Sequence, residues 1–147
     1  MEQSLSAFAQ QFRILYGLEK QDPGTYSPLD LAYIGDAVYE LVIRSYIIGH
    51  GNGQVSRLHQ RASHMVKASA QAAMIMALED RLTEEEHRIY KRGRNAHSYT
   101  MPKNASAADY RKATGLEALI GWLFLMEQYD RLTDLIHEGL VLLELTY

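Results

Sequence analysis

The strongest constraint in this sequence is an almost uninterrupted apolar segment, residues 31–43, which reads LAYIGDAVYELVI and contains two acidic residues. Asp36 and Glu40 are four positions apart, so on a helix they share a face with roughly 5–6 Å between their Cβ atoms. A buried charge is costly unless a cation or a basic side chain balances it. Arg44 is one turn away from Glu40 and is available as its partner, but no neighbour on the helix does the same for Asp36.

Apolar spacing and capping signals predict an all-helical chain. Three capping boxes, each starting at a Ser or Thr, mark helix starts at residues 27, 83 and 106. Gly93 is the predicted stop of the helix that begins at Thr83, and the stretch 93–105 is a predicted loop. No strand pattern is present. The predicted helices cover about 4–18, 28–48, 54–78 (with room for a kink), 83–92, 106–128 and 130–145.

The length and composition indicate one domain over residues 1–147. The chain has no cysteine, which excludes disulfides and thiolate metal sites. No apolar run approaches the roughly 18 residues of a membrane span. The N-terminal segment lacks the basic start and the small-residue cleavage site of a signal peptide, so we expect a cytoplasmic protein with no membrane partner.

The net charge of −3 hides a marked asymmetry. Residues 88–112 hold seven Lys or Arg and one acid, and residues 41–78 hold four basic residues, three histidines and no acid. Salt screens charges over about 8 Å, so such local patches matter more than the total charge. Two basic segments beside isolated carboxylates favour a polyanion held near a metal.

A second isolated carboxylate, Glu117, lies in the apolar run LEALIGWLF. Two carboxylates on different helices can converge on one Mg²⁺, which prefers oxygen ligands and retains several waters. Such an ion can activate water and stabilise charge on a phosphodiester. The alternative is a structural ion pair in which Asp36 or Glu117 contacts Arg111 or Lys112.

Several basic and amide side chains are candidates for phosphate contacts. The stretch 91–95, KRGRN, combines charge with a glycine that allows close backbone approach, although short charged runs are often simply solvated. Arg57, Arg61 and Lys67 are similarly ambiguous. The full candidate set is Arg57, Arg61, Lys67, Arg92, Arg94, Asn95, Lys103 and Asn104.

Three motifs resemble the ribonuclease III family. LAYIGDAVYE resembles its signature helix, which carries an LEFLGDAV-type core, and LEALIGWLF resembles its second catalytic helix, written DxxEALIG. Between them, RGRNAHSYTMPKN followed by YRKATGLEALIG resembles the Mini-ribonuclease III branch, which lacks a double-stranded RNA-binding domain. The resemblance covers about residues 27–128.

The resemblance implies an all-α ribonuclease III catalytic domain that acts as a symmetric homodimer on double-stranded RNA. Each protomer would hold Mg²⁺ and cut one strand, leaving a 5′-phosphate and a 3′-hydroxyl. Asp36 and Glu117 match the catalytic, metal-binding carboxylates, and Tyr33 matches an aromatic residue of the dimer interface. The implied role is maturation of the large-subunit (23S) ribosomal RNA precursor, assisted by a ribosomal protein.

Two positions depart from the wider family pattern. Ala32 and Thr114 occupy positions where the wider family usually has acidic residues. The Mini-ribonuclease III branch lacks the same two acidic residues. Glu40 is a candidate support for the site, and the alternative is that it pairs only with Arg44. The missing acids also motivate an alternative hypothesis, a catalytically silent ribonuclease III-like module that binds structured RNA or a ribosomal protein.

Overall fold

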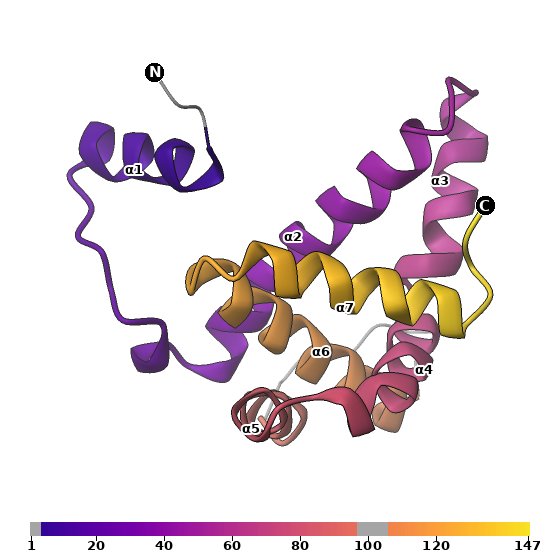
Figure 1. The fold of residues 1–147 in the computed structure, drawn as a ribbon. Helices are drawn as coiled ribbons and strands as arrows, with labels where there is room; N and C mark the ends of the chain where they lie inside the picture. Colours follow the sequence, from indigo (N-terminus) through magenta and orange to yellow (C-terminus); the bar gives the residue numbers. More distant parts are fainter. Residues whose placement is uncertain (1–3, 97–105) are drawn as a thin grey trace.

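The computed structural model describes residues 4–96 and 106–147, and every regular element in these ranges is helical. This confirms the predicted all-α fold class. Figure 1 shows the arrangement. The elements are α1 (Leu5–Tyr16), η1 (Pro23–Thr25), α2 (Pro28–Ile48), α3 (Val55–Val66), α4 (Ala68–Leu78), η2 (Glu79–Arg81), α5 (Glu84–Arg94), α6 (Ala107–Leu125) and α7 (Tyr129–Leu142).

The predicted capping residues begin the helices as expected. The Ser27 and Ser106 hydroxyls accept hydrogen bonds from the backbone N–H groups three residues later. Thr83 and Glu86 form the full reciprocal capping box of α5. Each cap pairs backbone donors that the first turn of a helix leaves free.

Two predicted boundaries need correction. The region 54–78 is two helices, because Lys67 has extended backbone angles (φ −63°, ψ 155°) and separates α3 from α4. Gly93 does not stop α5, which continues to Arg94. Gly93 is buried where α5 packs on α6, and a Cβ atom built on it would lie 2.7 Å from the Cβ of Ala118. The glycine therefore serves helix packing, and residues 97–105 of the predicted loop lie outside the described ranges.

Helix α6 is the centre of the domain. It contacts α2, α4, α5 and α7, which surround it in Figure 1. Every residue from 113 to 123 is buried except Glu117. A helix that is apolar on all sides belongs in a core, so the single acidic side chain in this stretch is conspicuous.

Helices α2 and α6 cross at very close range. A Cβ atom on Gly35 would lie 1.7 Å from the carbonyl oxygen of Glu117, and one on Gly121 would lie 2.0 Å from the carbonyl oxygen of Leu31. Both distances are far below van der Waals contact. The crossing therefore requires glycine on each helix, and it brings the two backbones together beside Asp36 and Glu117.

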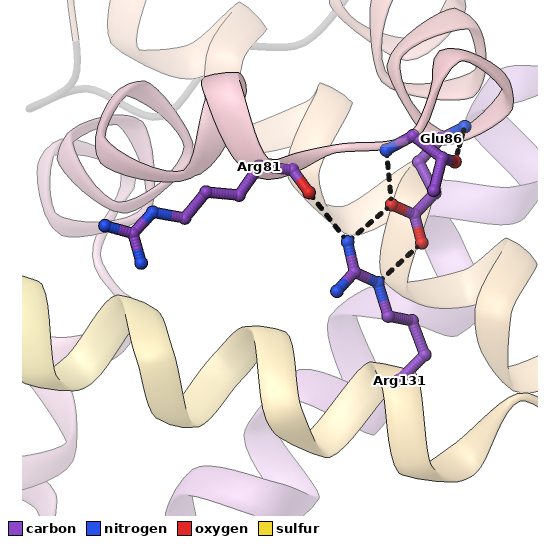
Figure 2. Close-up of polar contacts among 4 residues, drawn as sticks. Arg81, Glu86 and Arg131 are labelled. Atoms are coloured by element: carbon purple, nitrogen blue, oxygen red, sulfur yellow. Dashed lines mark hydrogen bonds and ion pairs between the residues drawn. The ribbon is translucent and has the colours of Figure 1, made fainter.

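A buried ion pair attaches the start of α5 to α7. Figure 2 shows Arg131 of α7 donating two hydrogen bonds of 2.8 Å to the Glu86 carboxylate and one of 2.8 Å to the carbonyl oxygen of Arg81. Burial acts to raise the pKa of Glu86, but the hydrogen bonds from Arg131 and from the Thr83 cap hold that pKa below its ordinary value. This carboxylate is thus balanced within the chain.

Helix α1 presents its apolar side chains to solvent in the described chain. None of its residues is buried, and Phe8 and Leu15 are 55% and 73% exposed. The α1 helix lies apart from the α6 core in Figure 1. No helix of the described residues is both long and apolar enough to cross a membrane.

We predict that Gly35→Ala destabilises the protein by about 1–3 kcal/mol or more, the usual cost of overpacking a core. The added methyl group meets backbone atoms of α6, which cannot rotate away as a side chain would. Urea unfolding measures the change. Gly53→Ala is the matched control, since its Cβ atom would meet only the Leu58 side chain at an ordinary 3.6 Å. Equal stability of the two variants would contradict the close crossing.

Candidate active site

The helix crossing places Asp36 and Glu117 next to each other. Asp36 follows Gly35, whose backbone lies against that of Glu117. Glu117 is half-buried, but Asp36 is exposed, so the expectation of two buried carboxylates was wrong for Asp36. Gly35 and Tyr39 take the inward positions of α2, which leaves Asp36 at the edge of the crossing. Of the two carboxylates at the crossing, Asp36 is therefore exposed and Glu117 is half-buried.

The pKa of Glu117 lies far above its ordinary value. Burial, followed by a hydrogen bond with Asp36 and the charge of Asp36, raises the pKa of Glu117 to about 9. Glu40 adds to the rise, and the Gln71 side chain partly opposes it. Without a cation, Glu117 is therefore mostly protonated at neutral pH.

Basic partners for this pair are missing from the described ranges. Neither Asp36 nor Glu117 forms an ion pair within residues 4–96 and 106–147. The Lys112 Nζ atom instead lies 3.4 Å from the Met76 Sδ atom, and Arg111 is exposed. The alternative of a structural ion pair is thus not supported by the described residues.

Glu40 pairs with Arg44, as the sequence suggested. The Arg44 Nη2 atom lies 2.8 Å from a Glu40 oxygen, and both side chains are well exposed. Such exposed pairs stabilise a protein little. Glu40 still influences the site, since its charge contributes to the raised pKa of Glu117.

Two buried polar residues behind the site were missed in the sequence. The Tyr39 hydroxyl donates to the Met65 carbonyl oxygen at 2.8 Å, and the Gln71 Nε2 atom donates to the Val66 carbonyl oxygen at 2.8 Å. Burial and the nearby Glu117 charge raise the pKa of Tyr39. The available signal for Gln71 was its position as the one long polar side chain in the α4 sequence ASAQAAMIMAL.

The oxygen-rich donor set fits a hard divalent cation. No group of three or more His, Cys, Asp or Glu residues that could hold a metal occurs in the described part of the chain. The site instead combines two carboxylates with the Gln71 Oε1 atom, which is buried and has no hydrogen-bond partner among the described residues. Mg²⁺ is commonly held by only one or two carboxylates and keeps several waters. These three residues therefore fit such an ion.

The two positions that depart from the family pattern are integrated into the fold. Ala32 is buried on α2, and the Thr114 hydroxyl donates to the Tyr110 carbonyl oxygen at 2.9 Å on α6. Neither residue offers a charged ligand to the Asp36–Glu117 pair.

The candidate phosphate-contacting residues fall into two groups. The first lies on and after α3, where Arg57 and Lys67 are exposed. Arg61 differs, since its Nη2 atom donates to the Leu145 carbonyl oxygen at 3.2 Å and its guanidinium lies over the Tyr147 ring at 4.7 Å. The guanidinium group of Arg61 is thus already bound by the C-terminal segment.

The second group lies at the end of α5. Arg92 and Asn95 are exposed, and they line a shallow surface hollow together with Arg88 and Lys91. The Arg94 guanidinium packs over the Tyr90 ring at 5.6 Å, and its Nε atom donates to the Asn95 Oδ1 atom at 3.3 Å. Lys103 and Asn104 lie outside the described residues.

An apolar stripe runs along the outer face of α2. Tyr33 is 85% exposed, and Leu41, eight residues later on the same face, is 61% exposed. Large exposed apolar side chains grouped in this way are typical of interaction surfaces. This placement is compatible with the predicted interface role of Tyr33, which stays a prediction.

Comparison with known proteins gives consistent matches. The family model described as Ribonuclease III domain matches residues 29–128. A Mini-ribonuclease 3 of Clostridium tetani is 49% identical over 117 residues, covering 79% of this chain and 78% of that protein. A Mini-ribonuclease 3 of Thermoanaerobacter sp. is 41% identical over 144 residues, covering 98% of this chain and 99% of that protein.

A solved structure supports the same fold. A crystal structure of a protein from Fusobacterium nucleatum superposes with a TM-score of 0.70 at 32% sequence identity. The match covers 77% of this chain and 90% of that chain.

We predict that Glu117→Gln removes a pH dependence of stability. In cation-free protein the folded-state pKa of Glu117 is about 9 against an ordinary 4.5, so between these values the folded protein holds a proton that the unfolded chain releases. Stability of the wild type therefore falls as pH rises from 5 to 9, by at most about 1.4 kcal/mol per pH unit. Urea unfolding in EDTA measures the slope, with exposed Glu19→Gln as control. Parallel pH curves for wild type and Glu117→Gln would contradict the prediction.

Proposed function

This chain belongs to the ribonuclease III family, within its Mini-ribonuclease 3 branch, and is thus an endoribonuclease of that family; we propose that it cleaves double-stranded RNA with Mg²⁺ held by Asp36 and Glu117. The observation that carries the proposal is the convergence of these carboxylates at the α2–α6 crossing without a basic partner among the described residues. A carboxylate with a perturbed pKa in such a setting is typical of functional sites.

The chain's own residues prepare the site for a cation. Asp36 offers an exposed carboxylate, and Glu117 supplies a second one once it releases its proton. The Gln71 amide opposes the rise in the Glu117 pKa and so favours the charged ligand. When bound, Mg²⁺ would supply charge stabilisation to the phosphodiester and an activated water, which gives a 5′-phosphate and a 3′-hydroxyl.

Exposed basic residues support contacts to the RNA backbone. Arg57 and Lys67 near α3 and Arg92 on α5 are exposed, and the half-buried Arg94 lies beside Arg92 at the end of α5, in a chain whose net charge is −3. A duplex is recognised mainly through its shape, phosphates and 2′-hydroxyls, so flexible basic side chains at two separate elements suit it. Asn95 can add a neutral hydrogen bond at the end of α5.

A symmetric homodimer fits the cutting of both strands. Each protomer contributes one Asp36–Glu117 site, and a two-fold axis presents the two sites to opposite strands. The exposed stripe with Tyr33 and Leu41 on α2 is the surface that this dimer would cover.

The substrate proposed from the family resemblance is the stem that joins the two ends of the 23S ribosomal RNA precursor. A ribosomal protein bound to that precursor would assist, and the reaction would take place in the cytoplasm.

We predict that Asp36→Asn lowers the cleavage of a labelled long RNA duplex by at least about a hundredfold, since loss of even an outer-shell partner costs metal sites about 10–100-fold. The assay compares Mg²⁺ with EDTA, and duplex with single-stranded RNA. Asp30→Asn is the matched control, because Asp30 is an exposed acid two turns earlier on α2. Cleavage by Asp36→Asn at the wild-type rate would reject the site assignment, and binding without cleavage by the wild type would favour the silent module.

We also predict that Arg92→Ala weakens RNA binding and lowers its dependence on salt. Each lost phosphate contact should reduce the slope of log K against log salt by roughly one unit or slightly less. The measurement uses the Asp36→Asn background so that the duplex stays intact. Lys20→Ala, an exposed change between α1 and α2, serves as control. A slope equal to that of the control would exclude Arg92 from the phosphate contacts.

A further inference from the structure

Gln71 is an unusual residue for its position on α4. Its side chain is only 4% exposed, and α4 is otherwise formed by small and apolar residues apart from Ser69, which is exposed. Buried amides normally satisfy both their donor and their acceptor atoms. Here the Oε1 atom has no hydrogen-bond partner in the described chain.

The orientation of this amide is determined by its neighbours. The Nε2 atom donates to the Val66 carbonyl oxygen at 2.8 Å, and Val66 is the last residue of α3. The last carbonyl groups of a helix lack partners within that helix and need a donor. A flipped amide would turn an acceptor toward this carbonyl, so Nε2 stays at Val66 and Oε1 stays unpaired.

The same amide touches the candidate active site. Helix α4 packs against α6, and the Gln71 side chain lies near enough to the Glu117 carboxyl to lower its pKa by favouring its ionised form. Gln71 therefore links the α3–α4 junction to the carboxylate that lies deepest in the site. The hydrogen bond to Val66 accounts for the amide nitrogen, but it does not account for the buried, unpaired amide oxygen.

We propose that Gln71 is a positioning residue of this site: its amide nitrogen holds the Glu117 carboxylate, and its amide oxygen accepts a hydrogen bond from a water molecule of the bound divalent cation. The inference rests on the proposed function, because it requires a cation at Asp36 and Glu117. It goes further in assigning a neutral residue from a third helix to the site.

The chemistry of the cation explains why an amide suits this position. Mg²⁺ keeps several of its waters, and each of these waters is a strong donor that needs an acceptor. Partners outside the direct ligands orient such ligands and waters. A neutral acceptor does this without adding a third negative charge to a pair that already repels.

The test is cation-dependent thermal unfolding of the full chain without RNA, titrated separately with Mg²⁺ and Mn²⁺. A ligand that binds the folded state raises the melting temperature as its concentration passes the dissociation constant. Gln71→Met keeps the size of the side chain and removes both polar atoms. We expect it to melt below the wild type without cation, because the Val66 carbonyl oxygen loses its donor, and to need about 10–100-fold more cation for the same rise.

Two further variants make the result decisive. Gln60→Met, an exposed change on α3, should respond to cation as the wild type does. Gln71→Leu also removes both polar atoms and should need about as much additional cation as Gln71→Met, and it serves in place of Gln71→Met if the latter does not fold. A wild-type cation requirement in Gln71→Leu would contradict the inference.

The outcomes separate this inference from the proposed function. A normal wild-type response with an equal response in Gln71→Met would overturn the role of Gln71 alone. A lower melting temperature of Gln71→Met without cation, combined with an unchanged cation requirement, would show a purely structural role and overturn it too. A wild type with no response to either cation would contradict the cation site itself and with it the role of Gln71.

Discussion

The close crossing of α2 and α6 is the constraint on which the rest of the structure depends. Gly35 and Gly121 let the two backbones meet with no side chain between them. This contact forces the next residue on α2, Asp36, to lie beside Glu117, whose helix is otherwise buried from residue 113 to 123. The position of the candidate active site is therefore a consequence of backbone packing, and the outer helices α4, α5 and α7 serve to hold α6 in place.

Glu86 and Glu117 are both at least partly buried, but their charges are balanced in different ways. Glu86 is almost completely buried, yet its pKa lies below the ordinary value because Arg131 and the Thr83 cap balance its charge. Glu117 is half-buried, and its pKa is raised first by burial and then by the hydrogen bond with Asp36 and the charge of that acid. The first arrangement is complete within the chain, whereas the second has no basic partner among the described residues and is the place where we propose a cation. Burial alone therefore does not identify a functional carboxylate, and the sign of the pKa shift is the better guide.

Local signals in the sequence were enough for most of the fold. The capping residues Ser27, Thr83 and Ser106 act within one turn of themselves, so their roles are readable without tertiary structure. Features that depend on another part of the chain were not readable. Gly93 was expected to end a helix but instead packs against α6, because its role is set by Ala118 across the interface.

The candidate site likewise has features that the local sequence predicted and features that depend on distant parts of the chain. Asp36 and Glu117 were predicted because an acid in an apolar run stands out by its type and because the motifs resemble a known family. The exposure of Asp36 was not predicted, since it depends on which face of α2 meets α6. Gln71 and the contact of Arg61 with Leu145 were also missed. A polar side chain in an apolar helix marks Gln71 as unusual, but neither it nor a single arginine indicates which distant group it will contact.

The two non-acidic positions, Ala32 and Thr114, clarify what kind of cation site this chain can build. Ala32 is packed in the core, and Thr114 uses its hydroxyl on the backbone of its own helix. A carboxylate at either position would be placed beside a pair that already raises the Glu117 pKa to about 9. With two charges in place of four, repulsion is smaller and fewer ligands are fixed by the protein. More of the cation's coordination is then left to water, and buried neutral acceptors such as the Gln71 oxygen become the natural means of orienting it.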